Sequence, residues 1–162
     1  TGAFDRFFFG SKTIAAIKEL QWPVIVVPPG VKFTSISKIG LACDLKKVVE
    51  TIPFKEIKML VNNFNAELHV LHISPHGTDS YSKETNEESI WLHEILGNLN
   101  PKYHFITDTD IEKGIAQFAE KNNIDLLITI TKKHNFISKI FQHSHSKRLV
   151  LHSHVPVMAI HE

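Results

Sequence analysis

Hydrophobic runs alternate with amphipathic stretches along the chain, and turn residues separate them. The runs are rich in β-branched and aromatic residues, which favour strands. They lie at residues 23–28, 38–44, 66–73, 103–107, 125–130 and 155–160. Strands that alternate with helices are typical of a parallel sheet covered by helices. The pattern therefore predicts an α/β fold, with a compact domain that begins at residue 38.

Start signals precede the amphipathic stretches. Pro53 suits the first turn of a helix that extends to about residue 63. A capping box, in which Thr is followed by Glu three residues later, marks the next two helices at Thr85–Glu88 and Thr109–Glu112. A fourth helix is expected at 144–152, before the last strand.

The first 28 residues do not form a complete unit by themselves. A shift of 133 positions places FFFGSKTIAAIKELQWPVIVVP on IFQHSHSKRLVLHSHVPVMAIH without a gap, so that Ser11 meets Ser144 and Pro23 meets Pro156. One helix and one strand expose an apolar face that needs a sheet. We expect residues 1–28 to be the end of a preceding domain, 29–37 a linker and 38–162 a complete second domain, with the chain a fragment of a longer protein.

The element order over residues 38–161 resembles the universal stress protein family. It runs from a strand ending in Asp through AELHVLHI and DLLITI to a phosphate-type loop, a helix and PVMAI, and GSKTIAAIKELQWPVIVVP resembles the end of another copy. The resemblance implies a tandem protein with the adenine nucleotide alpha hydrolase-like fold, a five-stranded parallel sheet flanked by helices. It also implies that residues 23–28 and 155–160 pair antiparallel, and that these strands mediate self-association and contact with the upstream part of the first domain.

The resemblance assigns a nucleoside site to the second domain. Members that bind ATP use an Asp after the first strand and a glycine loop whose backbone N–H groups close on the phosphates. Asp44 matches the nucleoside carboxylate, and Ala42 and Cys43 match backbone positions beside adenine. Ile73 matches an adenine-packing position, and Ser144 is the phosphate-loop residue that is retained.

The phosphate loop departs from the family pattern. Ile130, Lys133 and His143 stand where glycines would be, and no glycine follows residue 114. Bulky residues at positions that need close approach or positive φ would block the phosphates, so we expect weak or no ATP binding and no cofactor in this domain. The alternative is a functional ATP or AMP site in which Lys46, Lys132 and Lys133 replace the backbone amides.

The end of the first copy retains its phosphate residues. Gly10, Ser11 and Lys12 keep the pattern of a phosphate-binding helix start, although an ordinary helix cap explains them equally well. ATP or AMP would then bind in the first domain of the longer protein.

Composition and charge exclude several function classes. The 162 residues include 18 Lys plus Arg against 17 Asp plus Glu, a net charge of +1 without blocks of like charge, which argues against nucleic-acid and membrane-surface binding. No apolar run is long enough to span a membrane. The single cysteine, Cys43, and the absence of a signal-peptide pattern predict a cytoplasmic location.

No motif of a dedicated enzyme is present, and we expect a regulatory protein. The sequence has no HExxH motif, and His143, His145, His152 and His154 lack a spacing suited to metal binding. We expect a stress-response protein that is not an enzyme, whose second domain acts mainly in dimerisation or partner binding. A third hypothesis is a scaffold whose 11 histidines report pH.

Overall fold

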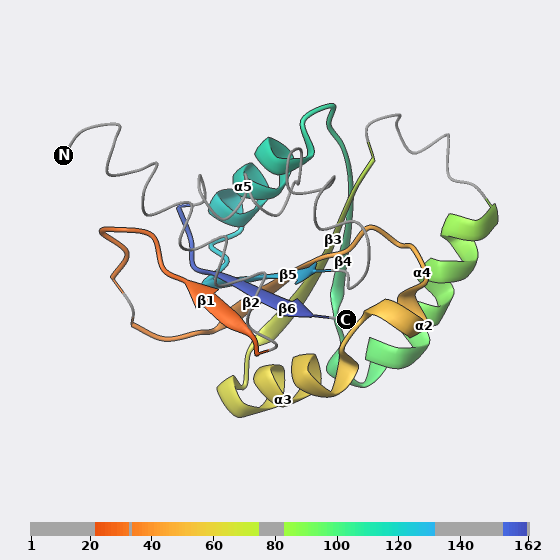
Figure 1. Cartoon of the computed structure of the whole chain (residues 1–162), viewed down its shortest axis with the longest axis horizontal. Helices are drawn as coiled ribbons and strands as arrows, with labels where there is room; N and C mark the ends of the chain where they lie inside the picture. Colours follow the sequence, from red (N-terminus) through yellow and green to blue (C-terminus); the bar gives the residue numbers. More distant parts are fainter. Residues whose placement is uncertain (1–21, 33, 75–82, 132–153, 162) are drawn as a thin grey trace.

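A single mixed sheet organises the chain. The computed structural model describes residues 22–32, 34–74, 83–131 and 154–161 (Figure 1). Its strands stand in the order β1-β6-β5-β2-β3-β4. Their bounds are β1 Val24–Val26, β2 Lys38–Ala42, β3 Glu67–Ser74, β4 Lys102–Thr107, β5 Leu126–Thr131 and β6 Val157–His161. Strands β2 to β6 run parallel, which confirms the predicted α/β class and the five-stranded parallel sheet.

Strand β1 is antiparallel to β6. Val24 stands opposite Ala159, and Val26 stands opposite Val157. The implied pairing between residues 23–28 and 155–160 is therefore confirmed, and it occurs within one chain. The tandem arrangement and the association between chains stay predictions.

The described helices are α2 Val48–Thr51, α3 Phe54–Phe64, α4 Lys83–Leu96, the 3-10 turn η2 Gly97–Leu99 and α5 Ile111–Lys121. The expected helix at 144–152 lies outside the described residues.

Both predicted capping boxes are wrong. Thr85 lies inside α4, and α5 is capped by Asp110, whose carboxylate accepts from the Lys113 N–H at 3.1 Å.

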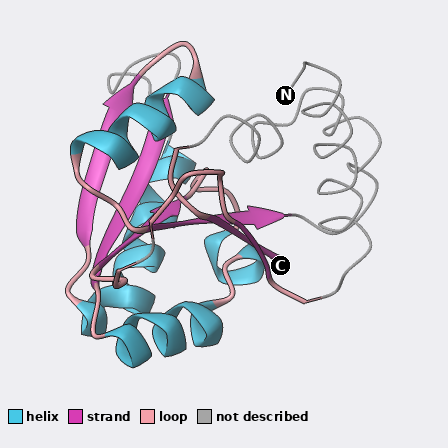
Figure 2. Ribbon diagram, turned by 90° about the vertical axis from the view of Figure 1, so that its left-hand side faces the viewer, coloured by secondary structure: helices cyan, strands magenta, loops and turns pink. Residues whose placement is uncertain are grey.

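Helices cover both faces of the sheet. Figure 1 shows α5 above the sheet and α3 below it, and Figure 2 shows the same layers from the side. Two buried clusters follow from this arrangement. The cluster beneath α3 and α4 includes Ile39, Leu41, Ile57, Leu68 and Leu92. The cluster beneath α5 includes Leu71, Ile73, Ile115, Phe118 and Leu127. Burial on both faces explains why these strands read as continuous apolar runs.

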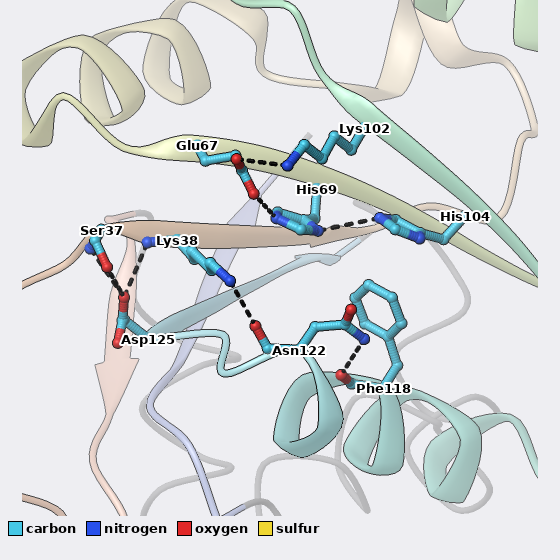
Figure 3. Close-up of polar contacts among 9 residues, drawn as sticks. All are labelled: Ser37, Lys38, Glu67, His69, Lys102, His104, Phe118, Asn122 and Asp125. Atoms are coloured by element: carbon cyan, nitrogen blue, oxygen red, sulfur yellow. Dashed lines mark hydrogen bonds and ion pairs between the residues drawn. The ribbon is translucent and has the colours of Figure 1, made fainter.

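A carboxylate joins the amino ends of two neighbouring strands. Asp125 accepts hydrogen bonds on Oδ2 from the Ser37 N–H at 2.9 Å, the Ser37 hydroxyl at 2.8 Å and the Lys38 N–H at 2.9 Å (Figure 3). The segment before β2 is thereby fixed to the start of β5, 88 residues later. No helix among the described residues has the length and apolar character needed to cross a bilayer.

Candidate functional site

The strand order predicts where a ligand would bind. The connections run outward from β2 through β3 to β4, and then return to β5 on the other side of β2. Open α/β sheets bind ligands at such a switch point, outside the carboxyl ends of the strands. Residues 43–47 follow β2 at this position. The segment after β5 falls within 132–153, so Lys133, His143 and Ser144 lie outside the described residues, as do Gly10, Ser11 and Lys12.

Asp44 lies at the rim of this switch point. Its side chain is exposed, and its Oδ1 accepts a hydrogen bond from the Lys46 N–H at 3.1 Å. Leu45 and Lys47 have φ angles of 53° and 51°, in the left-handed region. The tight turn presents Asp44 to solvent and leads directly into α2.

Cys43, by contrast, belongs to the sheet. Its N–H donates to the Leu71 carbonyl at 2.9 Å, and its carbonyl is 2.9 Å from His72 Nδ1. The residue is only 8% exposed, and its thiol accepts a hydrogen bond from the Leu45 N–H at 3.3 Å. The backbone donor expected beside adenine is therefore already engaged, and the His72 ring fixes the peptide that precedes Asp44.

Ile73 is a core residue beneath α5. Its side chain is 7% exposed. A Cβ added to Gly114 would lie 2.7 Å from Ile73 Cδ1, so this glycine permits the close approach of α5 to the sheet. Ala42 packs against the same cluster. Both residues face α5, and Ile73 offers little surface to a base.

Ile130 occupies an ordinary strand position. It pairs with Ile160, and its side chain packs against the cluster on the opposite face, beneath α3 and α4. It is absent from the positive-φ residues of the described chain. The expectation that Ile130 obstructs a phosphate cradle stays a prediction, because the loop that follows Thr131 lies outside the described residues. The steric argument now depends on residues after β5.

Several carboxylates that the sequence analysis missed lie at the same rim. Asp108 follows β4, and its N–H donates to the Ser74 carbonyl at 3.2 Å while its Oδ1 accepts from the Asp110 N–H at 2.9 Å. Glu112 is 7% exposed in the first turn of α5. Together with Asp44 these groups are carboxylates of the described rim, which also carries the exposed Lys46 and Lys47. The sequence signal for these carboxylates was the pair Asp108 and Asp110, which directly follows the predicted strand at 103–107.

A cavity lies on the other face of the sheet. It has a volume of about 440 Å³ between α4 and strands β3 and β4. Its lining includes Leu45, Val70, His72, Ile90, Tyr103 and Phe105. Burial raises the pKa of Tyr103, whose buried hydroxyl has no hydrogen-bond partner in the part of the chain that the structure describes. The cavity and the expected adenine position at Ile73 are thus on opposite faces.

Two histidines of β3 are part of the fold. His69 contacts Glu67 and His104, and His72 contacts the Cys43 carbonyl, so both are packed, hydrogen-bonded residues. Within the described ranges no three potential metal ligands come together. Of the four histidines considered for metal binding, only His154 is described, and it lies 3.7 Å from Glu120.

Family and structural comparisons agree with this architecture. The model of the universal stress protein family matches residues 37–161. The chain belongs to the universal stress protein family. No curated protein matches it in sequence.

Solved universal stress proteins share the fold at low sequence identity. One from Archaeoglobus fulgidus has a TM-score of 0.69 and 19% identity, covering 100% of this chain and 57% of that chain. A second from Archaeoglobus fulgidus, in complex with dAMP, has a TM-score of 0.56 and 17% identity over 76% of this chain and 97% of that one. A third from Pseudomonas aeruginosa has a TM-score of 0.63 and 15% identity, covering 91% of this chain and 55% of that chain. The chain thus spans about 57% of the first structure's length.

Proposed function

We propose that residues 38–162 form a regulatory universal stress domain that has lost triphosphate binding and acts in stress response through dimerisation or partner binding. The observation that carries this proposal is the described half of the switch point. There the Cys43 N–H is bonded to the sheet, and Asp108, Asp110 and Glu112 accompany Asp44. Polyphosphates need backbone donors and positive charge, and on this rim carboxylates stand beside the exposed Lys46 and Lys47. The glycine-free sequence after Gly114 points the same way.

Isothermal titration of the full 162-residue chain with ATP and with AMP, each with Mg²⁺, tests the loss of the site. We expect no saturable heat up to about 1 mM nucleotide, which corresponds to a binding free energy weaker than about −4 kcal/mol. A micromolar Kd for ATP would refute the proposal.

The alternative is a nucleotide site built with lysines. The structural relative with bound dAMP favours it, since that protein shares this fold and binds a nucleoside monophosphate. Lys46 lies next to the exposed Asp44 turn. The alternative requires Lys133→Ala and Lys46→Ala each to weaken nucleotide binding, and our proposal expects no binding for these variants or for the parent.

The surface of β1 supports the association role. Trp22, Ile25 and Val27 are 74%, 49% and 59% exposed, and β1 is the last strand at its end of the sheet. Exposed apolar side chains on an edge strand are a docking surface for another strand or domain. We propose that the occupant is another universal stress domain, either from the upstream part of a longer chain or from a second chain.

Sedimentation velocity at about 100 µM tests this surface. We expect a dimer, and we expect Ile25→Asp to shift the population to monomer. Ile90→Asp is the matched control, because Ile90 is similarly exposed at 59% but lies on α4. A parent chain that stays monomeric would exclude self-association and leave the upstream domain as the occupant. Equal effects of both variants would contradict a specific role for β1.

A further inference from the structure

Four side chains form a continuous hydrogen-bonded row across β3 and β4, which we call the histidine cluster: Lys102, Glu67, His69 and His104 (Figure 3). Lys102 Nζ donates to Glu67 Oε2 at 2.7 Å, and Glu67 Oε1 contacts His69 Nε2. His69 Nδ1 then faces His104 Nε2 at 3.0 Å.

The two histidine rings of the cluster pack between the sheet and α5, whereas the Lys102 and Glu67 side chains are 58% and 37% exposed. His69 is 4% exposed, and its ring lies parallel to the His104 ring with centroids 5.1 Å apart. The His104 ring centroid is 4.6 Å from that of Phe118 on α5. Glu67 on β3 contacts the His69 ring, and Lys102 on β4 is bonded to Glu67. Lys38 on β2 is bonded instead to the Asn122 carbonyl, and Asp125 to Ser37 and Lys38.

The hydrogen-bond chemistry limits how many protons the two rings can hold. An ionised carboxylate only accepts, so His69 Nε2 carries a hydrogen that it donates to Glu67. The 3.0 Å contact between His69 Nδ1 and His104 Nε2 then needs one hydrogen between two nitrogens. One added proton can be placed on the outer nitrogen of His104 with every bond intact. A second would set two N–H groups against each other.

We propose that His69 and His104 form a pH-sensitive latch that holds edge strand β4 to β3 and α5 and is released on acidification. Among the described strands, β4 lies at the end of the sheet and pairs with β3 alone, so loss of the cluster opens the sheet at this edge first. The proposal does not depend on nucleotide binding or on association through β1.

The direction of the pH effect follows from the His104 environment. Burial, the neighbouring His69 and Lys102 together hold the pKa of His104 below its usual value, despite the opposing effect of Glu67. The unfolded chain therefore binds this proton more readily than the folded chain. Stability is complete above the unfolded pKa, about 6.5, and decreases as the pH falls below it.

Urea denaturation between pH 8 and pH 5 tests the latch. Each proton taken up on unfolding raises the unfolding constant by up to tenfold per pH unit. We expect His104→Gln, which cannot titrate, to remove about one proton from this dependence. His154→Gln is the control for loss of a histidine outside the cluster, because His154 is 79% exposed. Equal pH dependence in the parent and His104→Gln would overturn the proposal.

NMR of the unmodified chain gives a second test that needs no variant to fold. We expect the His104 ring signals to titrate below about pH 6.5, and amide exchange along β4 to rise as the pH falls through the same range. A His104 titration at or above about pH 6.5, or β4 amides whose protection does not change with pH, would overturn the proposal.

Discussion

Removing the Asp125 carboxylate should weaken the connection between β2 and β5. Three groups donate to this carboxylate: the Ser37 N–H, the Ser37 hydroxyl and the Lys38 N–H. In Asp125→Ala all three lose this acceptor. A hydrogen bond to a charged group contributes about 1.5–3 kcal/mol when it is protected from water. Ser37 is exposed, so water replaces part of this stabilisation. We expect a loss of about 2–3 kcal/mol for Asp125→Ala and about 1 kcal/mol for Asp125→Asn, which keeps an acceptor oxygen.

Urea denaturation at pH 7 measures the loss, and the pH dependence gives an independent check. Burial opposes ionisation of Asp125, but the hydrogen bonds from Ser37 and Lys38 outweigh it and lower the pKa. The carboxylate therefore stabilises the fold above the unfolded pKa of about 3.9, and this contribution is lost as the pH falls through the lower folded value. The difference between parent and Asp125→Ala should shrink below pH 4.

Glu50→Ala is the control for a carboxylate of little structural importance. Glu50 pairs with Lys47 at 3.4 Å, and both side chains are 70% exposed. An exposed pair of this kind contributes at most about 1 kcal/mol. If Asp125→Ala changed stability no more than Glu50→Ala, the assignment of the β2–β5 connection to this carboxylate would be refuted.

Four further substitutions test local packing and the cap of α5, each measured as a shift in the urea midpoint. Gly114→Val should destabilise by about 2 kcal/mol, because the added carbons meet Ile73 beneath α5. Tyr103→Phe should stabilise by about 1 kcal/mol, because it removes a buried hydroxyl without a partner, and a loss of stability would indicate that this hydroxyl is bonded. Asp110→Ala should cost about 1 kcal/mol and Thr109→Ala less than about 0.5, and the reverse order would restore the predicted capping box.

Local patterns in the sequence were sufficient for the strands. Runs such as AELHVLHI are β-branched and apolar because both faces of β3 are buried, and β3 spans Glu67–Ser74. The cap of α5 was misplaced by one residue because Thr109 and Asp110 are both good acceptors. The short helix α2 has no capping signal in the nearby sequence. Its first N–H, that of Val48, donates instead to the Glu88 carboxylate on α4, 40 residues later, at 2.6 Å.

The side-chain networks could not be predicted, because they join residues far apart in the sequence. Glu67 and Lys102 are 35 residues apart and meet only through the β3–β4 register. At the candidate site, the position of Asp44 could be predicted, because this residue comes directly after an apolar strand. That the Cys43 N–H is engaged, and that Ile130 faces the core, depends on pairing and facing directions that composition does not encode.

The reversed direction of β1 determines how a larger assembly would be oriented. Any sheet that continued beyond β1, with its strands parallel to β1, would run opposite to β2 through β6. The carboxyl ends of its strands would then emerge on the side where this chain has its amino ends, near Asp125. Two domains joined in this way would open their ligand-binding edges in opposite directions, so neither domain could supply a residue to the other's site.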